Sequence, residues 1–394
     1  MLEAGNYLKF NLNNFQIEKN KFADILYFYK LPKKEINLDE AIEITKNSLL
    51  DSINHHLIAD VEVGLFLSGG IDSSVLLYLM RELKHEKIKT VSAIFPNTIY
   101  DESEKINELV KTFNTDHLEL KIKSKDFLEN LDNIFYHMDQ PTIDGVNTYF
   151  VSLAAKKAGL KVVLSGLGGD ELFYGYPSFF DLPKINKIKN LLKLFQIDKI
   201  LNLAADPFNI KYQKLIQIIK AKNLEEEYLI YRSVFTPNQI KKLINSDIFV
   251  NSYTFGLNSD CSHNSDFIRH IRTNSYISDY GLNSDYGQNS NYSPHSDTFA
   301  NSYKFGYHSD CGLISYLEMS YYLKNQLLRD SDVFSMAHSI ELRVPFVDNV
   351  LFENVVPIPD KYKIKNNISK FLLKEILKNK VSEKILFQKK QGFV

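Results

Sequence analysis

The sequence has no tryptophan, only two cysteines among 394 residues, and almost no net charge. Cys261 and Cys311 are too few for a disulfide framework or a four-cysteine zinc site. The 47 basic and 48 acidic side chains give −1, which argues against binding nucleic acid through bulk charge. No run of 18 apolar residues and no signal-peptide pattern occur, so no membrane partner is expected. These absences predict a cytoplasmic enzyme or binding protein.

Strand-like and helix-like segments alternate in the first half of the chain. Short β-rich runs predict strands at 61–67, 90–95, 117–122 and 161–165. Apolar residues at helical spacing predict helices at 38–57, 73–83, 106–113, 127–138 and 147–158. The alternation predicts an α/β fold with a parallel sheet, whose ligands bind at the carboxyl ends of the strands.

The rest of the chain carries other patterns. Residues 6–10 and 25–29 are expected to be short extended pieces. After Phe173 the pattern predicts helices only, at 187–195, 211–221, 224–234, 237–244, 314–328 and 369–377. Residues 246–312 interrupt them with a polar repeat, in which Asn251–Cys261 recurs as Asn301–Cys311 with three of its eleven residues changed. The repeat could be a module or a cation site, but its polarity favours an insertion that adds no core.

The clearest chemical motif is Leu-Ser-Gly-Gly-Ile-Asp-Ser-Ser at 67–74, between a predicted strand and a predicted helix. Its two glycines let the backbone approach an anion, and its serines add hydroxyl donors beside a helix N-terminus. No Gly-Lys-Ser/Thr follows, so the motif is not a Walker A loop. Asp72 suits an oxygen ligand to Mg²⁺ beside a pyrophosphate.

A second glycine-rich turn, Ser-Gly-Leu-Gly-Gly-Asp-Glu at 165–171, also follows a predicted buried strand directly. Three glycines at the end of a strand indicate close approach of a ligand. Asp170 would supply a second carboxylate to the same metal ion.

In this order, the motifs resemble the synthetase domain of the glutamine-dependent asparagine synthetases, within the PP-loop ATP pyrophosphatases. Residues 60–74 are similar to that family's pyrophosphate loop, and 163–173 to its adenosine and metal turn. Further similar stretches are 101–103 with 115–117, 335–348, 369–374 and 389–393. The resemblance implies a PP-loop (adenine nucleotide alpha hydrolase-like) parallel-sheet domain followed by a mainly α-helical region.

That resemblance also implies a division of the chain into five parts. They are a remnant of an N-terminal glutaminase domain at 1–35, the PP-loop ATP-binding domain at 36–180, a helical region at 181–245, the low-complexity insertion at 246–312, and a C-terminal helical region at 313–394 that completes the site.

The chemistry implied by the resemblance is an ATP-dependent amide ligation. A carboxylate, aspartate in the leading interpretation, becomes an acyl-adenylate with release of pyrophosphate, and ammonia then displaces AMP. The residues implied for the pyrophosphate are Ser68, Gly69, Gly70, Asp72, Ser73 and Ser74. Those implied to flank the adenosine are Phe66, Ser165 and Gly166. Asp72 and Asp170 would bind Mg²⁺, Lys370 would stabilise charge as the intermediate forms and collapses, and Lys390 would assist at the phosphates.

Three departures from the family qualify these expectations. Leu2 stands where the glutaminase nucleophile, a cysteine, is expected, so we expect the synthetase half alone, with a separate glutaminase subunit as one candidate ammonia source. Leu167 stands where asparagine-forming members commonly carry a glutamate that helps the amine attack, so either Glu171, Asp144 or another carboxylate substitutes, or the substrate differs. The chain also stops at Val394, where relatives usually continue.

Because of Leu167, acyl substrates other than aspartate remain alternatives. One alternative is an amidotransferase acting on a uronic acid in surface-polysaccharide synthesis, or a peptide cyclase like the lasso-peptide and β-lactam relatives. Another is an inactive remnant or a binding partner. Glu341 and Arg343 invite a catalytic interpretation, but a buried ion pair between the helical region and the sheet is favoured.

Overall fold

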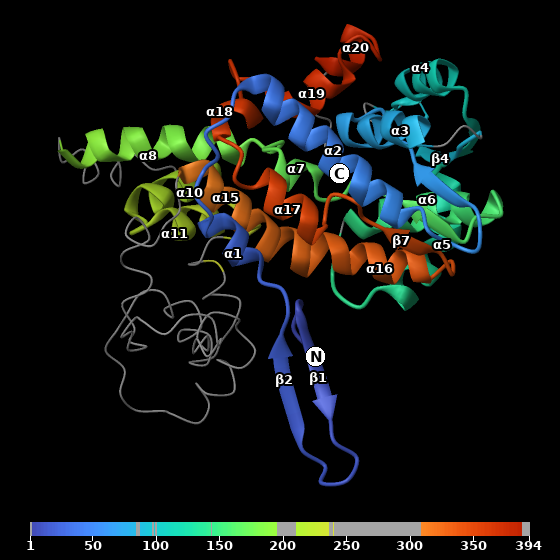
Figure 1. The fold of residues 1–394 in the computed structure, drawn as a ribbon, viewed down its shortest axis with the longest axis horizontal. Helices are drawn as coiled ribbons and strands as arrows, with labels where there is room; N and C mark the ends of the chain where they lie inside the picture. Colours follow the sequence, from blue (N-terminus) through green and yellow to red (C-terminus); the bar gives the residue numbers. More distant parts are fainter. Residues whose placement is uncertain are drawn as a thin grey trace. The chain divides into compact units, whose positions relative to one another are not determined.

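The computed structural model describes residues 2–83, 87–96, 98, 101–142, 144–194, 210–235, 239 and 309–387 (Figure 1). The chain divides into two compact units, of which the first comprises Met1–Lys184 with His308–Val394 and the second Ile185–Tyr307. Both glycine-rich turns belong to the first unit. Within the described part of the chain, no helix combines the length and hydrophobicity that a membrane crossing requires.

A five-stranded parallel sheet forms the centre of the first unit, with strand order β5-β4-β3-β6-β7. The strands are β3 (Val63–Phe66), β4 (Lys89–Ile94), β5 (Asp116–Lys121), β6 (Val162–Leu164) and β7 (Glu341–Arg343). In register, Leu65 of β3 lies opposite Thr90 of β4 on one side and Leu164 of β6 on the other. The sheet confirms the expected α/β class and its parallel strands.

The fifth strand corrects one expectation. Helices only were expected after Phe173, yet Glu341–Arg343 pairs with β6 in parallel. Three residues with charged ends carry almost no strand signal of their own. The strand forms because β6 offers its edge: Glu341 N donates to Lys161 O at 2.8 Å, and Ser165 N donates to Arg343 O at 2.8 Å.

The strand order defines where a ligand can enter. Helices α3 (Ile71–Leu83) and α4 (Ser103–Phe113) connect β3 to β4 and β4 to β5, whereas α5 (Ser124–His137) and α6 (Asp144–Lys157) lead back to β6. Because crossovers between parallel strands are right-handed, connections that run in opposite directions from β3 cover opposite faces of the sheet. The direction reverses between β3 and β6, and in open parallel sheets ligands bind outside the carboxyl ends of the strands at such a switch point.

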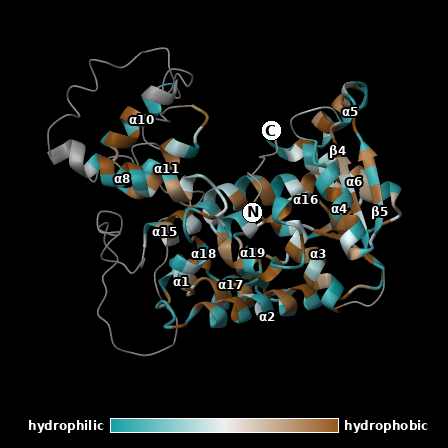
Figure 2. Cartoon of the chain, turned by 90° about the horizontal axis from the view of Figure 1, so that it is seen from above, coloured by the Kyte–Doolittle hydropathy of each residue, from teal (hydrophilic) through white to brown (hydrophobic). Residues whose placement is uncertain are grey.

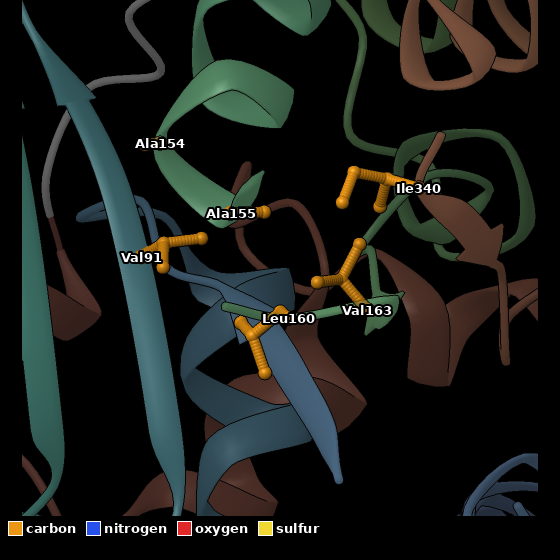
Figure 3. Packing of buried hydrophobic residues seen from close by; sticks show 6 residues of the cluster. All are labelled: Val91, Ala154, Ala155, Leu160, Val163 and Ile340. Atoms are coloured by element: carbon orange, nitrogen blue, oxygen red, sulfur yellow. The ribbon is translucent and has the colours of Figure 1, made fainter. Parts of the chain in front are cut away.

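The hydrophobic core between the sheet and α6 fixes this arrangement. Its buried members are Val91, Ala154, Ala155, Leu160, Val163 and Ile340 (Figure 3). Two alanines on α6 let the helix lie close to β4 and β5, because they bring little side-chain volume. Ile340 precedes β7, so the same cluster also anchors the fifth strand.

The C-terminal helices complete the first unit. They are α15 (Asp310–Leu317), η3 (Glu318–Leu327, a π-helix), α16 (Leu328–Met336), α17 (Asn349–Val355), α18 (Asp360–Lys363), α19 (Phe371–Leu377) and α20 (Glu383–Leu386). Helices α17 and α19 contact α2 (Leu38–His56), and α19 also contacts α3. Asn37 and Glu40 form a capping box at the start of α2. Hydrophobic and hydrophilic residues alternate along α2, as expected for an amphipathic helix (Figure 2).

The N-terminal residues form a hairpin and a helix. Strands β1 (Asn6–Phe10) and β2 (Ile17–Lys21) pair in antiparallel register. The expected extended piece at 25–29 is instead helix α1 (Ile25–Lys30). Asp24 caps α1 by accepting from Leu26 N at 3.0 Å, and the buried Tyr29 hydroxyl meets Ser315 Oγ at 2.6 Å. These contacts outweigh the weak extended pattern of so short a segment.

The second unit is helical where it is described. Helix α8 (Ser178–Leu194) continues into it, and α10 (Ile210–Lys220) packs on α11 (Leu224–Arg232) through Ile218, Ala221 and Ile230. Lys189 and Glu227 form a buried ion pair. The expected helix at 237–244, apart from Gln239, and Cys261 lie outside the described residues. So does the insertion at 246–312, except for its last four residues, which lead into α15 with Ser309 as its cap.

Candidate active site

Both glycine-rich turns lie at the switch point. Residues 67–70 connect β3 to α3, and residues 165–168 connect β6 to the short helix α7 (Gly169–Leu172). The two turns touch: a Cβ on Gly166 would lie 2.9 Å from Asp72 Cβ, and one on Gly169 would lie 2.6 Å from the Asp72 carboxyl carbon. Only glycine permits this approach, and it places Asp72 beside the second turn.

Internal hydrogen bonds shape the first turn. Ser73 Oγ donates to Ser68 O at 2.8 Å, and Ser74 Oγ donates to Gly70 O at 2.7 Å. Ser74 is fully buried, whereas Ser68, Gly70 and Asp72 remain partly exposed. The accessible side of the turn therefore offers the Ser68 hydroxyl and the Asp72 carboxylate, and the Ser74 hydroxyl maintains the shape of the loop.

Lys370 lies between the two aspartates that the sequence singled out. Its Nζ contacts Asp72 Oδ2 at 2.5 Å and Asp170 Oδ1 at 2.7 Å. These three side chains come from α3, α7 and the start of α19, so distant segments of the chain meet at one point. Lys370 is 8 % exposed and takes a left-handed backbone conformation with φ of 54°. A non-glycine residue in that conformation is held there by its surroundings, here by Lys370 N donating to Phe173 O at 3.1 Å.

Charge and packing both hold the lysine in place. Burial by itself would lower the pKa of Lys370, but the Asp170 and Asp72 carboxylates outweigh it and raise that pKa. The ammonium is therefore charged at neutral pH. Gly175 closes the site from one side, since a Cβ there would lie 1.8 Å from Asp170 Oδ1 and 2.4 Å from Lys370 Cε.

The two aspartates also suit a divalent cation. Both carboxylates reach the same nitrogen atom, so they are close enough to share one cation. No cluster of three His, Cys, Asp or Glu side chains fit for a metal occurs among the described residues. One or two carboxylates are the usual protein ligands of Mg²⁺ when phosphate oxygens and water supply the others. The donor set therefore fits the expected magnesium.

Glu171, the residue after Asp170, carries a buried carboxyl group beside the site. Burial and the neighbouring Asp170 raise the pKa of Glu171 to about 7, although the Tyr176 hydroxyl, which donates to Glu171 Oε1 at 2.7 Å, opposes the rise. Glu171 is 1 % exposed, and its backbone oxygen accepts from Ser315 Oγ at 2.8 Å. A carboxyl group so enclosed supports the turn through its hydrogen bonds and is shielded from solvent.

Glu102 is a residue whose role the sequence did not indicate. Its carboxylate accepts from Gly69 N at 3.3 Å, and Lys105 Nζ lies 3.8 Å from it. Burial raises the pKa of Glu102, while Lys105 opposes the rise. An acidic side chain thus lies at an amide of the turn predicted to bind an anion. In the sequence, Glu102 stands out only as part of residues 101–103, which are similar to the asparagine synthetases; that similarity assigns it no chemical role.

The residues expected at the adenosine lie at the same switch point. Phe66 packs against the core cluster of the sheet and α6. Ser165 is buried and Gly166 approaches Asp72, as described above. Leu167 is partly exposed, and its N–H donates to Ser165 Oγ at 3.4 Å. Lys390 lies outside the described residues.

The structure corrects the expectation that Glu341 and Arg343 form a buried ion pair. The two side chains do pair, at 2.6 Å, but the Glu341 side chain is 58 % exposed. Arg343 Nη1 donates to the carbonyl oxygens of His56 at 2.7 Å and Ile58 at 2.8 Å. The arginine therefore anchors the end of α2 to β7. The glutamate faces solvent because it begins an edge strand.

Comparison with known proteins identifies a family match. The family model described as asparagine synthase matches residues 45–394. Asparagine synthetase [glutamine-hydrolyzing] 1 of Bacillus subtilis is 29% identical over 358 residues, which cover 90% of this chain and 50% of the relative. The chain thus spans about half the length of this curated relative.

Two further relatives show the breadth of the similarity. Asparagine synthetase B [glutamine-hydrolyzing] of Escherichia coli is 25% identical over 175 residues, or 39% of this chain and 31% of the relative. A protein named amidase chyE, from Penicillium rubens, is 23% identical over 422 residues, which cover 99% of this chain and 57% of the relative. The similarity therefore extends to a protein that does not bear the synthetase name.

Proposed function

Because the chain belongs to the asparagine synthase family, we propose that it is an ATP-dependent ligase that converts aspartate and ammonia into asparagine. The observation that carries the proposal is the meeting of Asp72, Asp170 and Lys370 at the switch point of the sheet. Two carboxylates for a metal ion and one buried ammonium for developing negative charge are the groups that adenylation requires.

The proposed reaction has two steps. A carboxylate oxygen of aspartate attacks the α-phosphorus of ATP, the bond to the β-phosphate oxygen breaks, and pyrophosphate leaves. Ammonia then attacks the acyl carbon of the adenylate, the bond from that carbon to the AMP oxygen breaks, and the amine loses a proton. The products are asparagine, AMP and pyrophosphate.

The residues of the two turns receive separate roles in this proposal. Ser68, Gly69 and Gly70 bind the pyrophosphate through the partly open side of their turn, and Ser73 and Ser74 maintain its shape. Phe66, Ser165 and Gly166 flank the adenosine, and Lys390 assists at the phosphates. Asp72 and Asp170 hold Mg²⁺, which when bound neutralises phosphate charge. Lys370 stabilises charge on the pentacovalent phosphorus and on the departing AMP, because a buried ammonium acts as a strong point charge.

The test is product formation from ATP, Mg²⁺, aspartate and ammonium. We expect AMP, pyrophosphate and asparagine in equal amounts. Asp72→Ala and Lys370→Ala should each reduce pyrophosphate release by at least about a hundredfold, the cost typical of losing one charge-stabilising group. An exposed acid in the same unit, Asp139→Ala, serves as control, since its carboxylate pairs with Arg329 of α16 and neither glycine-rich turn contains it. ATP turnover without dependence on aspartate would remove the aspartate assignment.

Leu167 favours a second candidate substrate class, a uronic acid. An aliphatic side chain cannot take a proton from the attacking amine or bind ammonium, and it lies in the turn that carries Asp170. The chemistry would then be the same, with a uronic acid as the carboxylate. Mass spectrometry after incubation with candidate sugar acids separates the two: a gain of an amide on the sugar acid, with aspartate unchanged, favours the second.

The nitrogen source is also part of the proposal. We propose free ammonia as the nitrogen donor for this chain, with a separate glutaminase subunit as a candidate supplier in the cytoplasm. Ammonium should support asparagine formation, and glutamine added to this chain alone should not. Equal rates with glutamine would contradict this assignment.

A further inference from the structure

Lys370 raises a question that the proposed reaction does not answer. The lysine that should stabilise charge on the substrate is held by both carboxylates that should hold the metal ion. Each contact is a short, charge-assisted hydrogen bond. An ammonium and a divalent cation cannot both lie at bonding distance from the same two oxygens without strong repulsion.

We infer that Lys370 and a divalent cation are alternative occupants of the Asp72–Asp170 pair, so that metal binding releases the lysine toward the reacting groups. The inference rests on the metal assignment within the proposed function. It adds that the lysine balances the two partly buried negative charges until the cation binds.

Three observations make Lys370 suited to this exchange. The side chain is almost fully buried, so its charge needs partners inside the protein, and the two aspartates provide them. Gly175 has no side chain, and any Cβ there would collide with Asp170 Oδ1 and Lys370 Cε, so the lysine has a fitted position. The backbone of Lys370 is fixed at φ 54° by its bond to Phe173 O, which leaves the flexible stem as the part that moves.

The position of Lys370 ahead of α19 offers a matched control. Lys374 lies one turn further along α19 and is half-buried, and burial together with Lys370 lowers its pKa. Its amine lies over the ring of Phe387, at 5.9 Å from the centroid. Replacing Lys374 therefore removes a similar charge from the same helix and leaves both contacts of Lys370 with the aspartate pair in place.

The first test measures binding of Mn²⁺ to the full chain without nucleotide, from the electron paramagnetic resonance signal of free Mn²⁺. Lys370→Met keeps an unbranched side chain one atom shorter than lysine and removes the competing charge, so it should tighten Mn²⁺ binding by about tenfold or more. Lys374→Met should change the affinity by much less than Lys370→Met does, because the Lys374 amine lies at the Phe387 ring and does not occupy the contacts that Lys370 makes with the two carboxylates. The double variant Lys370→Met with Asp72→Asn should lose the gain. Equal affinities of the wild type and Lys370→Met would overturn the inference.

A second test needs no variant and covers the case in which Lys370→Met fails to fold. Brief acetylation of the wild-type chain, read by mass spectrometry, reports how accessible each lysine is. Millimolar Mn²⁺ should speed labelling of Lys370 severalfold and leave Lys374 unchanged. Labelling of Lys370 that stays constant as Mn²⁺ saturates its site would contradict the exchange. Neither readout requires amide formation, so a failure to make asparagine and a failure of this inference are separate results.

Discussion

Gly175→Ala is the substitution that probes the site with the smallest chemical change. The added methyl group would lie 1.8 Å from Asp170 Oδ1 and 2.4 Å from Lys370 Cε. To reach an ordinary carbon–oxygen contact, the Asp170 carboxylate must retreat by roughly 1.5 Å. A shift of that size breaks the 2.7 Å contact between Asp170 and Lys370.

The expected cost follows from the broken contact. A hydrogen bond between charged groups contributes about 1.5–3 kcal/mol, so stability should fall by about 2 kcal/mol. Displacing a reacting group by about 1 Å can cost ~10²-fold in rate, and pyrophosphate release should fall by about that factor. Thermal melting and a coupled pyrophosphate assay measure the two effects on the same preparation.

Gly159→Ala provides the matched control. It adds the same methyl group after α6 at a φ of 76°, where no atom lies within 4 Å of the new Cβ. The left-handed backbone costs an L-residue roughly 1–2 kcal/mol, so stability should fall by a similar amount while activity per folded molecule stays constant. Wild-type activity in Gly175→Ala, or an equal loss in Gly159→Ala, would refute the reasoning.

Two further predictions concern the acidic groups around the turns. The pKa of Glu171 is raised from 4.5 to about 7, so its contribution to stability is complete below about pH 4.5 and is lost as the pH rises through 7. The melting temperature of the wild type should therefore fall more between pH 5 and pH 8 than that of Glu171→Gln; parallel curves would show that Glu171 is not the group responsible. Glu102→Gln removes a negative charge from the Gly69 amide and should tighten binding of inorganic pyrophosphate by about fivefold, or roughly 1 kcal/mol, in calorimetry. Glu104→Gln is the control, because that side chain is exposed and pairs with Lys384; an equal gain there would point to bulk charge.

The sequence predicted the sheet well where strand and helix signals were long. Strands β3 to β6 and the helices between them occur at the expected places, because each carries several apolar residues in a regular pattern. The fifth strand was missed because Glu341–Arg343 is stabilised by pairing with β6 and has little apolar content of its own. For the same reason the sequence predicts an extended piece where α1 forms: the six residues of this helix depend on the Asp24 cap and on burial of Tyr29.

The candidate site could be predicted only in part from the sequence. Both turns were predicted to lie at the carboxyl ends of strands, and the strand order now places them side by side. The meeting of Lys370 with Asp72 spans 298 residues of sequence, so only the resemblance suggested it. The buried state of Ser74 and the contact of Glu102 with Gly69 depend on packing between α3 and α4, which no local pattern encodes.

The measurement that tests the central claim most directly follows an oxygen atom. If the carboxylate attacks the α-phosphorus, one of its oxygens stays on the phosphate when ammonia displaces AMP. Aspartate labelled with ¹⁸O in its side-chain carboxylate, incubated with ATP, Mg²⁺ and ammonium, should therefore yield AMP carrying one ¹⁸O atom for each asparagine formed. Asparagine formed together with unlabelled AMP, or AMP formed without any amide product, would contradict the account.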